Sequence, residues 1–92
     1  SRDRNAMVKA RRIASTIYLY YCRDKNKYQK ANDFALEALQ LSKDEGISYK
    51  EKVYTLEAAA QSHLFLGKKN EALGFNQEAL EIANESNTDS LK

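Results

Sequence analysis

The residues best suited to acid–base, nucleophilic and metal chemistry are scarce, because the chain has one histidine and one cysteine and no glycine-rich phosphate motif. A metal centre needs several such ligands, and a nucleophile needs a base beside it. His63 falls on the apolar stripe of an expected helix, and Cys22 ends the apolar face of another. We expect both to pack in the interior, Cys22 as a small hydrophobe. The sequence therefore predicts no enzyme, no metal site and no cofactor.

Tyrosines are the second informative group. Tyr18, Tyr20 and Tyr21 follow one another along one expected helix, in which neighbouring positions point in different directions. They cannot all face the same interior, so at least one is expected to be exposed. An exposed aromatic side chain is either an anchor for a partner or a contact for a neighbouring repeat, and the sequence leaves both open.

The elements that position these residues are expected to be helices. The chain has 92 residues, 42% hydrophobic and 30% charged, which suits a single globular domain. It has no proline and three glycines, too few for the tight connections of a sandwich or barrel. The spacing of apolar residues predicts an all-α fold with helices at about residues 4–23, 28–46, 48–66 and 70–85, followed by a polar tail at 87–92 that frays.

Three short signals set the expected helix ends. Gly46 is expected to end the second helix in the left-handed conformation, which glycine accepts without penalty. Ser48 and Glu51 form a capping-box pattern, in which each side chain accepts from a free backbone N–H at the start of the third helix. Gly67, followed by two lysines, is expected to end that helix.

An internal repeat organises the whole domain. Ala31, Ala38 and Leu39 recur as Ala72, Ala79 and Leu80, so the second helices of two hairpins align with an offset of 41 residues, the difference between positions 72 and 31. This period lies in the range of helical repeats that stack into solenoids. We divide the chain into repeat one at about 4–45 and repeat two at about 48–86.

The two units resemble the tetratricopeptide repeat, with its pattern W-x2-L-G-x2-Y followed by A-x3-F-x2-A. In the second unit the matching positions hold Leu56, Ala59, Ala60, His63, Ala72, Asn76 and Ala79, and in the first unit they hold Ser15, Tyr18, Leu19, Cys22, Ala31, Ala35 and Ala38. The resemblance is to the long-period variety of about 40 residues. It implies two antiparallel helix hairpins in a right-handed stack, an α-solenoid fragment with small alanines at close helix contacts.

The resemblance also implies a binding surface, because the first helices of such hairpins line the concave face. The groove residues it implies, by number in this chain, are Thr16, Tyr20, Arg23, Tyr54, Glu57, Gln61 and Phe65. Aromatic and amide groups of this kind suit an extended peptide or a helix lying in a groove. The implied function is a protein- or peptide-binding module, part of a larger regulatory, signalling or scaffolding protein. The alternative is a structural repeat that stacks and dimerises without a ligand of its own.

The charge distribution bears on the remaining partner classes. Residues 1–12 carry a net charge of +4 and residues 71–92 a net charge of −4, within a total of +2. Nucleic-acid readers present a larger basic excess on one face, so RNA binding is a distant alternative. The lone cysteine and the absence of a long apolar run favour a cytoplasmic protein without a membrane segment, with an exported sensor domain as the other reading.

Self-association is expected from the repeat architecture itself. Each hairpin buries one face against the next, so two repeats leave an uncovered apolar face at each end. Phe75, Leu80 and Ile82 cannot all face inward from the last helix, because their positions span more than one stripe. We expect a homodimer in which these three residues contribute to the contact.

Overall fold

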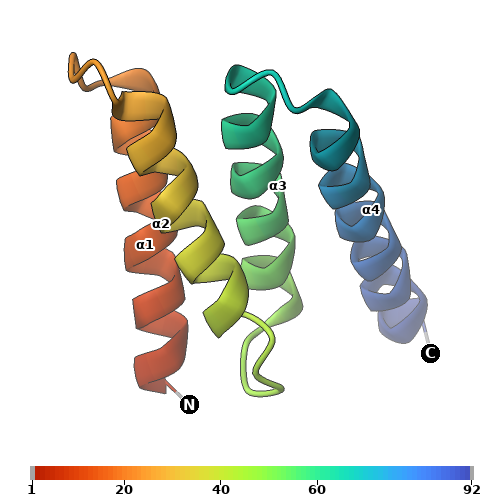
Figure 1. Ribbon diagram of the computed structural model, residues 1–92. Helices are drawn as coiled ribbons and strands as arrows, with labels where there is room; N and C mark the ends of the chain where they lie inside the picture. The colour runs from red at the N-terminus through yellow and green to blue at the C-terminus, as the bar shows by residue number, and fades with distance from the viewer. Residues whose placement is uncertain (1, 92) are drawn as a thin grey trace.

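The computed structural model describes the backbone of residues 2–91 and the side chains of residues 4–86. Four helices follow one another, α1 (Arg2–Tyr20), α2 (Lys27–Leu41), α3 (Tyr49–Phe65) and α4 (Lys69–Leu91), and no strand occurs within 2–91. Consecutive helices run in opposite directions (Figure 1). The domain measures 47 × 30 × 18 Å, so it is a compact but flattened stack of helices. The all-α prediction is confirmed.

Adjacent helices make all the packing contacts. α1 packs on α2, α3 packs on both α1 and α2, and α4 packs on α3 but on neither α1 nor α2 across its described residues. Small side chains allow this close approach. The alanines predicted at close contacts are all buried, with at most 5% of their surface exposed: Ala31, Ala35, Ala38, Ala59, Ala60, Ala72 and Ala79. A separate apolar cluster lies near the start of α1 and the end of α2. It is formed by Val8, Ala38 and Ile47, and Leu41 packs against it.

The start of α3 confirms half of the predicted capping box. Ser48 Oγ accepts from the backbone N–H of Glu51 at 3.2 Å. The Glu51 carboxylate does not return the bond, because it pairs with the Arg12 guanidinium of α1. Instead the Ser48 N–H donates to Asn5 Oδ1 at 3.2 Å, and Asn5 Nδ2 donates to the Gly46 carbonyl at 3.1 Å. A side chain from α1 therefore completes the cap of α3 and holds the loop before it.

The two glycine signals have different outcomes. Gly67 adopts a φ of +81°, and the N–H groups of Gly67 and Lys68 donate to the carbonyls of Leu64 and His63, which closes α3 in a Schellman motif. The prediction for Gly46 was wrong. α2 ends five residues earlier, at Leu41, and Gly67 is the one glycine of positive φ in the described chain. The Gly46 N–H instead donates to Asp44 Oδ1 at 2.8 Å, so the carboxylate shapes this turn.

Two further helix ends differ from the expected ones. α1 ends at Tyr20, three residues before Arg23, where the N–H groups of Tyr21 and Cys22 both donate to the Ile17 carbonyl and close the last turn. α4 continues to Leu91, beyond the expected end at Glu85, because the polar stretch after it holds neither glycine nor proline to stop a helix. The side chains of 87–92 lie outside the described residues.

α1 and α3 are not offset by 41 residues, as the matching positions Cys22 and His63 had implied. His63 meets Phe75 edge-on at 4.9 Å between ring centroids, while Phe34, the equivalent of Phe75 at the 41-residue offset, stacks on Tyr18 at 5.6 Å. Tyr18, and not Cys22, is therefore the counterpart of His63. The first helices are offset by 45 residues, the difference between 63 and 18, because the α1–α2 connection is longer than the α3–α4 connection.

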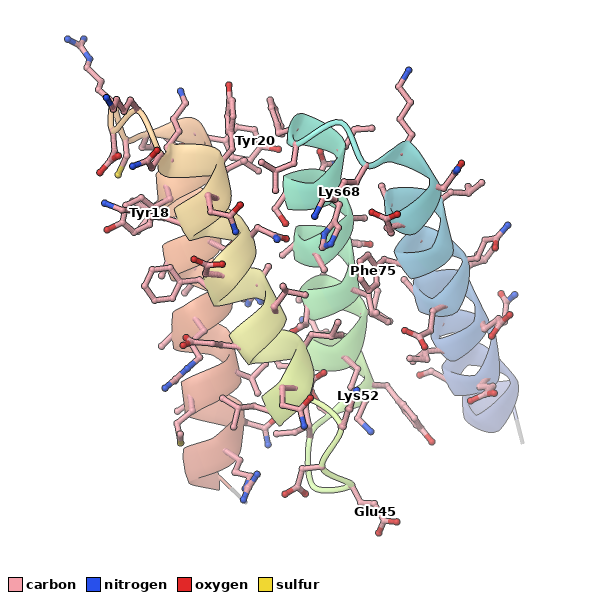
Figure 2. All side chains as sticks on the ribbon, in the orientation of Figure 1. Tyr18, Tyr20, Glu45, Lys52, Lys68 and Phe75 are labelled. Atoms are coloured by element: carbon pink, nitrogen blue, oxygen red, sulfur yellow. The ribbon has the colours of Figure 1, made fainter. Side chains whose placement is uncertain are left out.

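The one histidine and the one cysteine are buried to different degrees. His63 has 7% of its surface exposed, and its Nδ1 lies 2.8 Å from the Ala59 carbonyl, an acceptor, so Nδ1 carries the proton. Phe75 projects from α4 toward α3 (Figure 2), where its ring meets that of His63. Cys22 is a half-buried free thiol in the α1–α2 connection, beyond the helix it was expected to end. No helix in the described chain has both the length and the apolar character needed to cross a bilayer.

Candidate partner-binding groove

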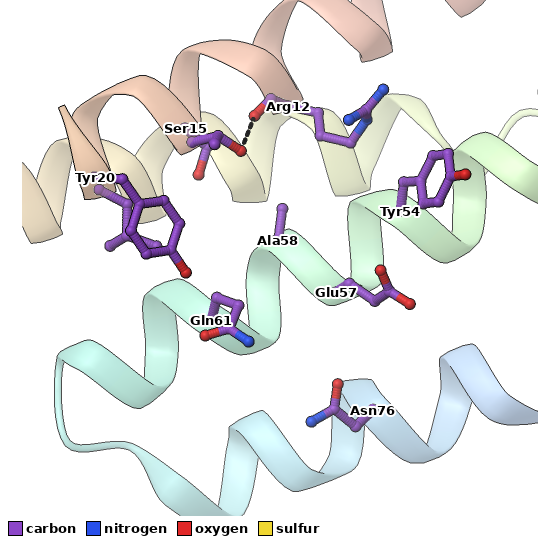
Figure 3. Close-up of a pocket in the computed structure, with 10 residues that line it drawn as sticks. Arg12, Ser15, Tyr20, Tyr54, Glu57, Ala58, Gln61 and Asn76 are labelled. Carbon is purple, nitrogen blue, oxygen red and sulfur yellow. Dashed lines mark hydrogen bonds between the residues drawn. The ribbon is translucent and has the colours of Figure 1, made fainter.

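A groove of about 400 Å³ lies between α1 and α3 and is bordered on one side by α4. Figure 3 shows Arg12 and Tyr54 toward one end and Tyr20 at the other, with Asn76 rising from α4. The residues that line the groove are Arg12, Ser15, Thr16, Leu19, Tyr20, Tyr54, Glu57, Ala58, Gln61 and Asn76. Apart from Asn76, all of them belong to α1 and α3.

Five of the seven groove residues named from the sequence line this groove: Thr16, Tyr20, Tyr54, Glu57 and Gln61. Phe65 lies beyond its end, where its ring stacks on Tyr28 at 5.1 Å and meets the Tyr20 ring edge-on at 5.9 Å. It therefore supports Tyr20 rather than lining the groove. Arg23 is exposed in the α1–α2 connection, outside the groove, because α1 ends before it.

One end of the groove is built around Arg12. Its guanidinium makes a two-pronged contact with the Glu51 carboxylate, Nε to Oε2 at 3.2 Å and Nη2 to Oε1 at 3.3 Å. The same guanidinium lies 5.0 Å from the centre of the Tyr54 ring. Both charged side chains are mostly buried, with 20% and 15% exposed, so the pair is better shielded from solvent than a surface ion pair. This cluster fixes Tyr54 and neutralises the positive charge.

The middle of the groove carries unengaged polar groups. Glu57, Gln61 and Asn76 are exposed, and no hydrogen bond or ion pair in the described part of the chain engages their side chains. In contrast, Thr16 Oγ1 donates to the Arg12 carbonyl of its own helix at 3.2 Å. Two amides and one carboxylate thus offer donors and acceptors to whatever lies between the aromatic ends.

The groove residues named from the sequence did not include Arg12, Ser15, Leu19 or Asn76, which also line it. The four-residue spacing of Arg12, Thr16 and Tyr20 puts all three on one face of α1, and extending that series backward from Tyr20 would have found Arg12. Asn76 carries no comparable signal, because its approach to the groove depends on how α4 packs against α3.

The three residues expected to mediate self-association fall on two faces of α4. Phe75 meets His63, and Ile82 lines a cavity with Leu56 and Leu39, so both face the interior of the stack. Leu80 faces outward with 62% of its surface exposed, and Leu73, one heptad earlier, is 57% exposed. The outer face of α4 therefore carries two leucines, of which the sequence analysis named one.

The two carboxyl groups whose pKa is lowered, Asp24 and Asp44, lie away from the groove, in the turns between helices. The Lys30 ammonium, 2.6 Å away, and the Asn26 N–H lower the pKa of Asp24 below its ordinary value of 3.8. The Gly46 N–H, followed by the charge of Arg4, lowers the pKa of Asp44. Among the described residues, no group of three or more His, Cys, Asp and Glu side chains is placed to hold a metal ion.

Comparison with protein-family models, with curated proteins and with solved structures finds no match for this chain.

Proposed function

We propose that the chain is a protein- or peptide-binding module of the tetratricopeptide type, a unit of a regulatory or scaffolding protein, and that it takes an extended peptide between α1 and α3. In this proposal the four helices form two hairpins that stack as a right-handed α-solenoid fragment. Support comes from α3, which packs on both helices of the first hairpin, and from the buried alanines that recur at 41 residues.

The observation that carries the binding proposal is the set of unengaged polar groups between two aromatic ends. Glu57, Gln61 and Asn76 have no partner in the described chain, whereas nearby Arg12 is held by Glu51. An extended peptide exposes the backbone N–H and C=O groups that carboxamide side chains pair with. Tyr20 and Tyr54, 53% and 37% exposed, supply apolar surface at the two ends.

Titration calorimetry against an extended-peptide library tests this function. Gln61→Ala should weaken binding of a selected peptide about tenfold, which is the loss of one or two hydrogen bonds worth roughly 1.4 kcal/mol. Gln40→Ala is the matched control, because Gln40 is an exposed glutamine on α2, outside the groove. Tyr54→Ala should weaken binding at least as much, with circular dichroism showing that helicity is retained.

Equal affinities for wild type, Gln61→Ala and Gln40→Ala would contradict binding in this groove. A salt series on any nucleic acid that binds tests the RNA alternative, for which affinity must fall steeply with ionic strength.

A structural role is the second candidate, because a specific observation favours it. Both outer helices expose large apolar side chains, Ile13 and Ile17 on α1 and Leu73 and Leu80 on α4. A stacking repeat needs such faces, and a groove-binding monomer does not.

A further inference from the structure

Each outer helix carries an exposed apolar stripe. On α1 and just beyond its end, Ile13, Ile17 and Tyr21 are 42%, 45% and 79% exposed, and they share one helical face. On α4, Leu73 and Leu80 are 57% and 62% exposed. Neither stripe is covered by another part of the described chain.

The contact between the two hairpins shows how such faces are covered inside this molecule. α3 lies on α2, where Ser62 Oγ meets Asn32 Oδ1 at 2.9 Å in a fully buried contact. Near the other end of the same interface, Leu39 of α2 and Leu56 of α3 line one cavity. The α2 face of this interface is thus marked by positions 32, 35 and 39, and Ala35 between them is fully buried.

The exposed face of α4 is the repeat of that α2 face. At the 41-residue offset, positions 32, 35 and 39 become Leu73, Asn76 and Leu80, all of them exposed. Each face has one polar residue among these three positions, Asn32 on α2 and Asn76 on α4, and the α4 face has leucine at the other two.

The exposed face of α1 is the repeat of the α3 face in the same way. At the 45-residue offset set by Tyr18 and His63, the buried Thr55, Ala59 and Ser62 of α3 correspond to Ala10, Ala14 and Ile17 of α1. The chain therefore exposes both halves of its own internal interface, one at each end of the stack.

Charge favours bringing these two ends together. Glu71, Glu78, Glu81 and Glu85 on α4 have no hydrogen-bond or ion-pair partner within the described chain, and Lys9 beside the α1 stripe also has none. The three arginines of residues 4–12 already pair with Asp44, Glu37 and Glu51 of the same chain, so in that segment Lys9 is the cation that can meet these carboxylates. Such surface charges steer association and are screened by salt, whereas the apolar contact is not.

We infer that α1 of one copy docks on the outer face of α4 of a second copy, in the arrangement by which α3 docks on α2. This contact is head-to-tail, since it joins two different faces, and it leaves one free face of each kind at the ends of every assembly. It produces open chains of increasing length rather than a closed dimer. In the same arrangement the incoming α1 lies beside α3 and extends the row of first helices that forms the groove.

Sedimentation velocity over a concentration series tests the inference with two variants. Ile17→Glu disables the α1 face and Leu80→Glu disables the α4 face, both at exposed positions where the fold should be retained. Leu36→Glu is the control, because Leu36 is 40% exposed on α2 and lies on neither stripe. Wild type and Leu36→Glu should sediment faster as concentration rises, without a limit at the dimer, while each disabled variant should stay monomeric or associate at least tenfold more weakly.

Mixing the two disabled variants is the decisive step. Ile17→Glu keeps a working α4 face and Leu80→Glu keeps a working α1 face, so an equimolar mixture should form one-to-one heterodimers and nothing larger. A monomeric wild type at every concentration would overturn the inference. So would a mixture that stays monomeric, or a dimer of either variant alone, which would indicate a symmetric contact. Gln61→Ala should leave association unchanged, so failure of the groove proposal and failure of this one are distinguishable.

Discussion

Thr55 provides a sharp test of how α3 is held in the stack. Its side chain is fully buried on the face of α3 that meets α2, and its Oγ1 has no hydrogen-bond partner in the part of the chain that the structure describes. Replacing threonine by valine exchanges the hydroxyl for a methyl group of similar size. Thr55→Val therefore removes an unsatisfied buried polar atom without opening a cavity.

The expected gain follows from the desolvation of that hydroxyl. Burying a hydroxyl without a partner destabilises a protein by about 1–3 kcal/mol, and the new methyl group adds apolar burial. Allowing for imperfect packing of the branched side chain, Thr55→Val should raise the free energy of unfolding by about 1 kcal/mol. For a domain of this size that corresponds to a rise of roughly 4–8 °C in Tm.

Ser62→Ala is the matched variant, and it should lower the free energy of unfolding where Thr55→Val raises it. Ser62 lies two turns along the same face and is equally buried, but its hydroxyl contacts Asn32 Oδ1. Its removal leaves the Asn32 carboxamide, 3% exposed, without that partner, at a cost of about 1–3 kcal/mol.

Chemical denaturation followed by circular dichroism measures both variants against wild type. Thr55→Val less stable than wild type by 1 kcal/mol or more would refute the reasoning, because it would mean that the hydroxyl contributes to the native state. Equal changes in the free energy of unfolding for Thr55→Val and Ser62→Ala would also contradict the reasoning, because only the Ser62 hydroxyl has a hydrogen-bond partner in the described chain.

Three more changes have expected outcomes. Arg12→Leu should lower the free energy of unfolding by about 1–3 kcal/mol in urea denaturation, because it leaves the mostly buried Glu51 carboxylate unpaired, and the exchanged pair Arg12→Glu with Glu51→Arg should recover part of the loss. Gly74→Ala should raise Tm, since a Cβ there meets no atom within 4 Å inside α4, while Gly67→Ala should lower it, because φ is +81° there. The pKa of Asp44 is lowered in the folded state, so its stabilising effect is present above pH 3.8 and is lost as pH falls through the folded value. Acid unfolding of Asp44→Asn should accordingly show a weaker dependence on pH below 4 than wild type.

Local sequence signals determined the elements and their contact residues. Helical spacing, the Ser48 cap and Gly67 act over three to five positions, and the structure agrees with each. The alanines that recur at 41 residues also identified the buried contacts, because only small side chains let helices approach closely. Helix geometry alone predicted that at least one of Tyr18, Tyr20 and Tyr21 is exposed, and the structure exposes Tyr20 and Tyr21.

Contacts between distant segments were decided by the tertiary structure. Glu51 has the right spacing for a capping box, but Arg12 lies 39 positions earlier in sequence and is brought beside it by packing of α1 on α3. Asn5 then replaces it at the cap. The expected bond between the Ser48 N–H and the Glu51 carboxylate is replaced by two contacts with side chains of α1, and the spacing of residues within α3 carries no information about α1.

The same distinction applies to the groove and to the outer faces. The resemblance to the tetratricopeptide repeat implied a shared surface for Tyr20, Tyr54 and Gln61, and all three line the groove. The length of the α1–α2 connection set the 45-residue offset of the first helices, and the side on which α4 packs turned Asn76 to the groove and Leu80 to solvent. A one-dimensional pattern fixes which residues share a face of a helix, whereas the direction of that face depends on the helix against which it packs.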